Sequence, residues 1–229
     1  GEEGHQSGEG RSRTNIGLPG LQLELLKEIK KVNQNIVLVT MSGRPLDLTW
    51  EDKNIPAIVQ AWHLGSKSGD AIAQVLYGDY NPSGKLTMSF PRNVGQVPIY
   101  YNYKNTGRPS TSIEQVTNSG YADVENSPLY SFGFGLSYTS FEYSDFKIDT
   151  NSMTKDSKIN ASIAVKNTGE YAGKEVVQLY LRDIVGSIAR PMKELKGFEM
   201  IELKPGETKT VTFEIDNSLL EFYSFNKVW

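Results

Sequence analysis

The sequence predicts an α/β layered domain over roughly the first hundred residues, followed by an all-β sandwich. Two observations carry this prediction. Before residue 91, continuous apolar runs alternate with amphipathic helical patterns, as in layered α/β proteins. From residue 138 onward, apolar and polar residues alternate in short segments separated by turn signals, which is typical of an antiparallel sandwich of the immunoglobulin-like type.

The first part of the chain is expected to contain two helices and two buried strands. Residues 18–33 show an amphipathic helical pattern, and Pro19 suits the first turn of that helix. Residues 35–41 and 57–62 are continuous apolar runs, typical of strands buried on both faces of a parallel sheet. Residues 70–77 predict a second helix. The order helix, strand, strand, helix indicates a partial α/β sandwich.

The second part of the chain is expected to contain five strands. The periodicity disappears over residues 91–137, where Pro, Gly, Asn, Ser and Tyr dominate, and this many tyrosines are unusual in a disordered segment. Turn signals at residues 167–169 and 204–207 then separate segments of period two. The expected strands are residues 141–150, 158–166, 174–183, 194–203 and 208–215.

These changes of pattern set the expected domain limits. Residues 1–98 would be the C-terminal part of an α/β sandwich, residues 99–137 an ordered linker, and residues 138–229 the β-sandwich. The chain begins at Gly1 without an initiator Met or a signal peptide, and it ends at Trp229 just after an apolar run. We therefore expect it to be part of a longer protein.

The composition excludes several classes of function. A net charge of −3 gives no electrostatic indication of nucleic-acid or membrane binding, and no apolar run approaches the length of a transmembrane helix. Because there is no cysteine, the chain has no disulfide, thiolate nucleophile or cysteine metal site. With His5 and His63 as its only histidines, we expect no metal and no cofactor, and a structural role for His63.

One glycine-rich segment is similar to a phosphate-binding loop but does not fit it. Five residues rather than four separate Gly78 and Gly84, and Leu86 stands where a hydroxyl group would bind magnesium. A turn-rich loop after a helix is therefore the better interpretation. Three tyrosines could stack on sugar rings, although packing between domains is the favoured interpretation: Tyr100, Tyr101 and Tyr103.

A single glutamate stands between two glycines near the N-terminus, in the segment Gly8-Glu9-Gly10, and Arg11 and Arg13 follow it. Glycine loses more backbone entropy than other residues on folding, so two of them around one side chain suit a sharp turn that exposes it. A polar N-terminal loop without a specific role is the alternative, and residue types alone leave both open.

The chain resembles the C-terminal half of glycoside hydrolase family 3 enzymes, of the β-glucosidase and β-xylosidase kind. The resemblance extends over nearly the whole chain. It rests on the segments SGEGRSRTNIGLPGLQLELL, MSGRPLDL, GDYNPSGKLTMSFPRNVGQVPIYYNYKNTGRP, PLYSFGFGLSYTSF, VKNTGEYAGKEVVQLYLRD and RPMKELKGFEMIELKPGETKTVTFEI. It implies a β/α barrel, an α/β sandwich and a fibronectin type III-like sandwich. The barrel and the front of the α/β sandwich would precede this chain, and the last strands would follow Trp229.

The resemblance also implies a site. Members of this family hydrolyse glycosides with retention, using an aspartate nucleophile on the barrel and a glutamate acid/base on a loop of the second domain. That glutamate lies in a segment similar to Ser-Gly-Glu-Gly, which identifies Glu9 as the general acid/base. Arg11 and Arg13 would bind substrate or anchor the loop. Glu2 and Glu3 are rival carboxylates that lack the flanking glycines.

The function implied by this resemblance is that of a fragment of a retaining, exo-acting β-glucosidase-like enzyme. Its partners would be an oligosaccharide or β-glycoside substrate and the missing barrel domain, without nucleic acid, membrane or cofactor. Alone it would be inactive, and family resemblance favours a periplasmic or secreted location. The alternative is a non-catalytic carbohydrate-binding or spacer module, and a barrel encoded in the same gene would decide between the two. The preferred sugar would depend mostly on the barrel's pocket.

Overall fold

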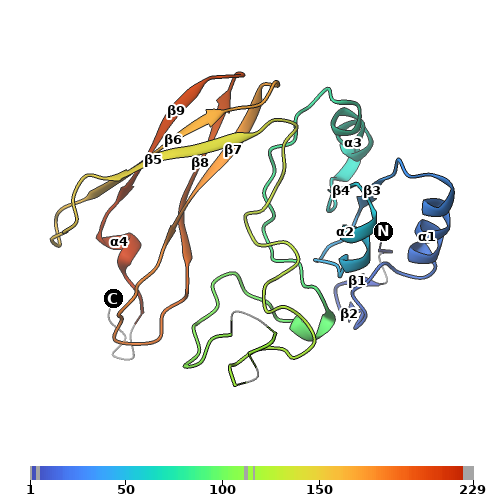
Figure 1. The fold of residues 1–229 in the computed structure, drawn as a ribbon, viewed down its shortest axis with the longest axis horizontal. Coiled ribbons are helices and arrows are strands. Elements are labelled where there is room, and N and C mark those ends of the chain that lie inside the picture. Colours follow the sequence, from blue (N-terminus) through green and yellow to red (C-terminus); the bar gives the residue numbers. More distant parts are fainter. Residues whose placement is uncertain (1, 4–5, 111–112, 116, 224–229) are drawn as a thin grey trace. The chain divides into compact units, whose positions relative to one another are not determined.

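The computed structural model describes residues 2–3, 6–110, 113–115 and 117–223 (Figure 1). Contacts between Cα atoms divide the chain into two compact units. Unit 1 comprises Gly1–Asp79, Leu86–Tyr101 and Thr106–Phe134, whereas unit 2 comprises Tyr80–Lys85, Asn102–Asn105 and the chain from Gly135 onward. Each unit is described by itself, and the limits 1–98, 99–137 and 138–229 stay a prediction.

Unit 1 is built around a small parallel sheet. Strand β3 (Val37–Thr40) pairs in parallel with β4 (Ala57–Gln60), and Thr40 lies opposite Gln60 at the carboxyl end of the pair. Parallel strands require a crossover connection, and here it contains helix α2 (Thr49–Asn54). The sequence prediction missed α2, because six residues are too few to show a helical period.

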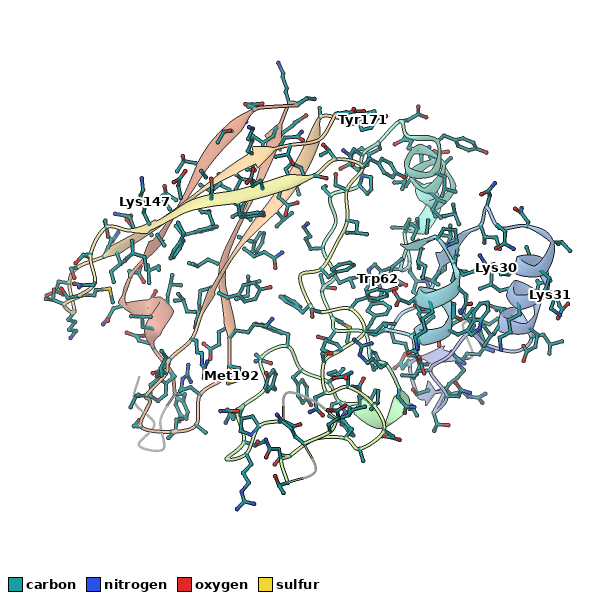
Figure 2. The ribbon with its side chains drawn as sticks, viewed as in Figure 1. Lys30, Lys31, Trp62, Lys147, Tyr171 and Met192 are labelled. Carbon is teal, nitrogen blue, oxygen red and sulfur yellow. The ribbon has the colours of Figure 1, made fainter. Side chains whose placement is uncertain are left out.

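Two longer helices belong to the same unit. Helix α1 (Gln22–Val32) precedes β3 and begins after Pro19, later than the sequence pattern predicts, and its last turn carries the lysines labelled in Figure 2. Helix α3 (Ser68–Tyr77) follows a short 3-10 helix, η1 (Gly65–Lys67), and ends at Gly78. Gly78 has a φ of +84°, the left-handed conformation that commonly terminates helices. A mostly parallel α/β arrangement is therefore confirmed.

The strands of unit 1 are less buried than their apolar sequences predict. Val37, the first residue of β3, is 49% exposed, and Met41, at the end of the first run, is 37% exposed. Val37 and Ala57 are exposed and most of the other residues of β3 and β4 are half-buried, so the expectation of burial on both faces is wrong. The core of the unit centres on three fully buried side chains that lie outside the strands: Leu46, Leu48 and Phe90.

The segment without periodicity is folded against that core. In the residues of it that the structure describes, one short 3-10 helix, η2 (Val94–Gln96), is followed and preceded by irregular backbone. The N–H of Phe90 donates to the carbonyl of Tyr130 at 2.8 Å, and the Tyr101 ring stacks on Phe132 with their centroids 4.1 Å apart. Backbone bonds and ring stacking therefore order a stretch with few regular elements.

The described part of unit 2 contains two antiparallel sheets that share one apolar core. The first has the strand order β5-β6-β9 and the second pairs β7 with β8. Their bounds are β5 Phe141–Ile148, β6 Ile159–Asn167, β7 Gly173–Leu181, β8 Glu194–Leu203 and β9 Thr208–Ile215. The buried side chains between the sheets are Val165, Val177, Ile201, Leu203 and Val211. The five predicted strands are therefore confirmed, and a short helix, α4 (Asn217–Leu220), follows them.

A fully buried asparagine joins the edges of this sandwich. The Oδ1 atom of Asn167 accepts from the hydroxyl of Thr139 at 2.7 Å and from the N–H of Gly169 at 3.1 Å. Its Nδ2 atom donates to the carbonyls of Tyr171 at 2.7 Å and Leu203 at 3.0 Å. The four hydrogen bonds use the full capacity of the amide. Asn167 thereby connects the end of β6 to its turn and to the end of β8.

Candidate active site

Glu9 lies at the tip of a very short hairpin in unit 1. Strand β1 (Ser7–Gly8) pairs antiparallel with β2 (Arg11–Ser12), and Glu9 and Gly10 form the turn between them. Gly10 has a φ of +76°, whereas Glu9 is not among the residues with positive φ. A positive φ at the second central residue alone fits a type II turn, which favours glycine there. The hairpin thus presents the exposed Glu9 side chain on a tight turn.

Glu2 has a different environment, because two arginines enclose its carboxylate. Its side chain is fully buried, and its Oε1 atom accepts from Nη2 of Arg13 at 2.7 Å and lies 3.2 Å from Nε of Arg44. Nη2 of Arg13 also donates to the carbonyl of Gly17 at 3.1 Å. The N–H of Glu2 donates to the carbonyl of Met41, just beyond β3. Glu2 is therefore held in charge-assisted contacts inside the protein.

Arg44 closes the base of the hairpin. Its Nη1 atom donates to the hydroxyl of Ser12 at 2.9 Å and to the carbonyl of Arg13 at 3.0 Å, and its Nη2 atom donates to the carbonyl of Gln6 at 2.9 Å. Gln6 directly precedes β1, while Ser12 and Arg13 lie at the end of β2. One planar guanidinium group therefore bonds both legs of the hairpin at once.

The backbone that carries Arg44 is itself fixed at the carboxyl end of β3. Ser42 is fully buried and its hydroxyl donates to the carbonyl of Arg44 at 2.8 Å. The side-chain amide of Gln60 donates to the Ser42 oxygen at 3.3 Å and accepts from the hydroxyl of Thr40. A polar network from β3 and β4 therefore supports the loop below the hairpin.

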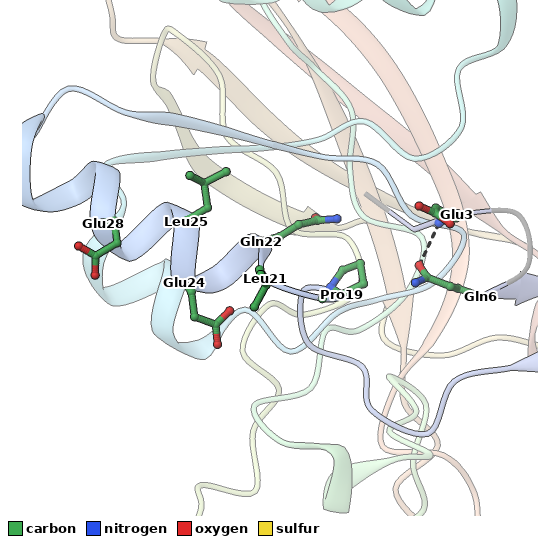
Figure 3. Close-up of a pocket in the computed structure, with 9 residues that line it drawn as sticks. Glu3, Gln6, Pro19, Leu21, Gln22, Glu24, Leu25 and Glu28 are labelled. Atoms are coloured by element: carbon green, nitrogen blue, oxygen red, sulfur yellow. Dashed lines mark hydrogen bonds between the residues drawn. The ribbon is translucent and has the colours of Figure 1, made fainter.

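The remaining predicted site residues lie on the surface. Arg11 is exposed on β2, opposite Gly8. Glu3 is exposed, and its N–H donates to Oε1 of Gln6 at 3.0 Å (Figure 3). Glu3 faces a shallow pocket against the start of α1, lined by Glu3, Gln6, Pro19, Gly20, Leu21, Gln22, Glu24, Leu25 and Glu28. The lining combines carboxylates with apolar side chains and does not include Glu9.

Arg44 is a site residue that sequence reasoning did not find. Its only local signal is weak, because an arginine in the loop after a buried strand is common. The three groups of the hairpin that its guanidinium bonds lie 31, 32 and 38 positions earlier in the chain. Such contacts depend on how the N-terminal segment folds back onto the sheet, which residue types and spacing do not encode.

Within the described residues, no three or more His, Cys, Asp or Glu side chains come together to hold a metal ion. His63 is exposed, and a structural role for it stays a prediction. In the same part of the chain, no helix combines the length and the apolar character needed to cross a membrane.

Comparison with protein families matches both parts of the chain. Residues 1–138 match the glycosyl hydrolase family 3 C-terminal domain, and residues 175–229 match the fibronectin type III-like domain. The periplasmic beta-glucosidase of Salmonella typhimurium is 50% identical over 225 residues, which are 98% of this chain and 29% of that protein. A beta-xylosidase of Formosa agariphila is 44% identical over 212 residues, which are 91% of this chain and 28% of that protein.

Solved structures give the same result. The beta-glucosidase of Listeria innocua in complex with glucose has a TM-score of 0.92 and 38% identity, covering 99% of this chain and 32% of that one. A mutant of that enzyme in complex with laminaribiose has a TM-score of 0.91 at the same coverage. The chain therefore spans less than a third of each of these relatives.

Proposed function

Because the chain belongs to glycoside hydrolase family 3, we propose that it carries the general acid/base of a retaining, exo-acting enzyme that hydrolyses β-glucosides. The acid/base is Glu9. The nucleophile is an aspartate on a β/α barrel in another part of the same protein. This barrel is the partner that the 229 residues need, and alone they hydrolyse no glycoside.

The observation that carries the assignment is the contrast among the three carboxylates near the N-terminus. Glu9 is exposed at the tip of a hairpin whose base is fixed, so its side chain is free to reach a substrate outside the chain. The Glu2 side chain is fully buried between Arg13 and Arg44. Glu3 is exposed but belongs to the pocket beside α1 rather than to the turn. Of the three, only Glu9 combines exposure with a supported position.

Glu9 acts in two steps of the reaction, first as a general acid and then as a general base. In the first step its protonated carboxyl group gives a proton to the glycosidic oxygen while the aspartate attacks the anomeric carbon. In the second step the carboxylate removes a proton from water, which attacks the glycosyl-enzyme. Retention requires the two carboxyl groups to lie about 5–5.5 Å apart. A positioned acid/base contributes about 10²–10⁴-fold to such a reaction.

The two arginines after Glu9 have different roles, one in substrate contact and one in anchoring the loop. Arg11 is exposed on the same hairpin as Glu9, so it is the one that we assign to substrate contact. Arg13 directs its guanidinium group to Glu2 and to the carbonyl of Gly17, which supports anchoring of the loop. An arginine beside the acid/base would bind sugar hydroxyl groups through several N–H donors.

The substrate class follows from the relatives. Listeria innocua beta-glucosidase structures are described in complex with glucose and with laminaribiose, whereas the Formosa relative is a beta-xylosidase. We therefore assign a β-linked glucoside as substrate, with a β-xyloside as the competing choice. Initial rates of the full-length enzyme on matched aryl β-glucosides and β-xylosides would decide between them.

The decisive experiment replaces Glu9 by Gln in the full-length enzyme that contains this chain. Turnover of an unactivated disaccharide should fall by about 10²–10⁴-fold, because its leaving group needs a proton. An activated aryl glycoside should still form the glycosyl-enzyme and then stall. Added azide needs no general base, so it should restore turnover and yield a glycosyl azide of retained configuration.

Glu3→Gln is the matched control, since it removes an exposed carboxylate from the same segment. Its turnover should stay within about twofold of the parent. If Glu9→Gln leaves disaccharide hydrolysis unchanged, Glu9 is not the acid/base. If the full-length protein binds β-glucosides without cleaving them, the chain belongs to a non-catalytic carbohydrate-binding module.

A further inference from the structure

We propose that Arg44 is a positioning residue for Glu9: its guanidinium group fixes both legs of the β1–β2 hairpin and so determines where the Glu9 carboxyl group is presented. This inference rests on the proposed acid/base role of Glu9. It adds Arg44, from the loop after β3, as a residue that holds Glu9 in its working position in advance.

The hairpin needs such support because its own ladder is minimal. Each strand has two residues, and their pairing joins only two residue pairs. Ordering one residue costs about 1–2 kcal/mol of backbone entropy, which a ladder of this size does not offset. The three bonds from Arg44 reach Gln6 before β1 and Ser12 and Arg13 at the end of β2. They close the loop where its two ends meet.

The guanidinium group is itself fixed in orientation. Its Nε atom lies 3.2 Å from Oε1 of Glu2, and Oε1 also accepts from Nη2 of Arg13 at 2.7 Å. The side chain of Arg44 is 19% exposed, so solvent weakens these contacts little. Glu2 therefore acts as the shared counterion that holds Arg44 in the plane in which it bonds both legs.

The geometry also separates Arg44 from Arg13. Arg13 shares the Glu2 carboxylate, but its other side-chain bond goes to the carbonyl of Gly17, beyond the hairpin. Arg44 is the residue whose side chain joins the two legs. In addition, its own carbonyl accepts from the buried Ser42, which links the clamp to the carboxyl end of the sheet.

The test uses two substitutions in the full-length enzyme. Arg44→Met leaves Glu2 neutralised by Arg13 alone and removes all three bonds to the hairpin. Arg44→Lys keeps a positive charge beside Glu2, but an ammonium group cannot form the planar fork that bonds both legs. If Arg44 acts by geometry, both variants should lose activity. If it acts by charge alone, Arg44→Lys should keep it.

The expected signature is selective for substrates that need the acid. Turnover of an unactivated disaccharide should fall about 10–100-fold in both variants, because small displacements of a catalytic group cost this much. Formation of the glycosyl-enzyme from an activated aryl glucoside should change by less than about threefold, and azide should restore part of the turnover. A purely structural defect would lower all of these rates together by reducing the active fraction. Active-site titration with a slow mechanism-based glycoside measures that fraction.

A double variant separates this inference from the proposed function. In the Glu9→Gln background, Arg44→Met should cost less than about twofold more, because the group that it positions is already absent. If Glu9→Gln alone has no effect, the proposed function fails and the role of Arg44 fails with it. If Glu9→Gln behaves as proposed but Arg44→Met is fully additive, Arg44 acts independently of Glu9 and only this inference is overturned. Full activity of Arg44→Lys would also overturn it.

The matched control is Lys158→Met in unit 2, which removes the cation of an exposed pair with Glu214. It changes the net charge by the same amount as Arg44→Met, and its kinetics should match the parent enzyme. Loss of disaccharide turnover in this control would mean that net charge alone explains the Arg44 variants, which would also contradict the proposal.

Discussion

Replacing Asn167 by Asp tests how far a single buried amide holds the β-sandwich together. The two side chains have nearly the same shape, so the substitution creates no cavity. The change is confined to one group: the NH₂ that donates to the carbonyls of Tyr171 and Leu203 becomes an oxygen. At neutral pH a buried carboxylate oxygen then faces two carbonyl oxygens that have lost their donor.

The magnitude follows from those two bonds. Each buried carbonyl left without a donor costs about 1–3 kcal/mol. A protonated Asp can donate to one of the two carbonyls, so in acid the variant should lose only about 1–3 kcal/mol of unfolding free energy. Ionisation at this buried site is unfavourable and adds to the loss at neutral pH, for a total of about 3–5 kcal/mol.

The pH dependence has a definite sign. Burial without a cation raises the pKa of the new Asp in the folded state above its ordinary value, so the folded state binds the proton more tightly. The stability of the variant relative to the parent is therefore highest in acid. It falls as the pH rises from the unfolded-state pKa to the folded-state pKa, by up to about 1.4 kcal/mol for each pH unit.

Hydrogen exchange in the 229-residue chain measures the loss of stability locally, in peptides from β6 and β8 at pH 4 and pH 7. Peptides from α3 in unit 1 are the internal control, and Asn151→Asp is the control for an exposed asparagine. A loss below about 1 kcal/mol at pH 7, or a loss of equal size at both pH values, would refute the reasoning.

Two further changes test unit 1. Gly10→Ala adds a methyl group that meets nothing within 4 Å, so its whole cost is the left-handed backbone, about 1–2 kcal/mol. Disaccharide turnover of the full-length Gly10→Ala enzyme should fall about 5–30-fold. Gly10→Asn should lose less turnover, because Asn tolerates this backbone. Equal turnover of the parent and both variants would contradict the turn geometry. Burial raises the pKa of Glu51 on α2, so the parent loses stability as the pH rises past its unfolded-state pKa. Glu51→Gln should therefore unfold at higher urea concentration at pH 7 and equally at pH 4, and no gain at pH 7 would refute this.

The β-sandwich could be predicted almost residue by residue. A strand with one face on the core repeats every second residue, and turns such as Asn167-Thr168-Gly169 mark where the repeat stops. Predicted and observed bounds of β6 and β9 agree within one residue. In unit 1 the same reasoning found β3 and β4 but overestimated their burial. An apolar composition indicates that a strand can be buried on both faces. Whether both faces are buried depends on the elements that pack against it.

The candidate site was predictable only in part. Glycines around Glu9 indicated a tight, exposed turn, and the hairpin with its positive φ at Gly10 agrees with that interpretation. Sequence could not rank Glu2 against Glu9 by environment, because both are glutamates in a polar segment. The burial of Glu2 depends on Arg44, more than forty positions away in the chain. Long-range side-chain contacts of this kind carry no local period, so no pattern could reveal them.

The carboxyl end of a parallel sheet explains why the β1–β2 hairpin is built where it is. Open α/β folds place their functional groups at this edge, where the chain leaves each strand as a loop. Here Thr40 and Gln60 end their strands opposite one another, and their side chains bond to each other beneath Ser42. Ser42 in turn holds the backbone of Arg44. The β1–β2 hairpin, whose strands have two residues each, has little stability of its own. Its position is therefore determined by the register of β3 and β4. Catalysis by Glu9 would then depend on strand pairing as much as on the turn that presents it.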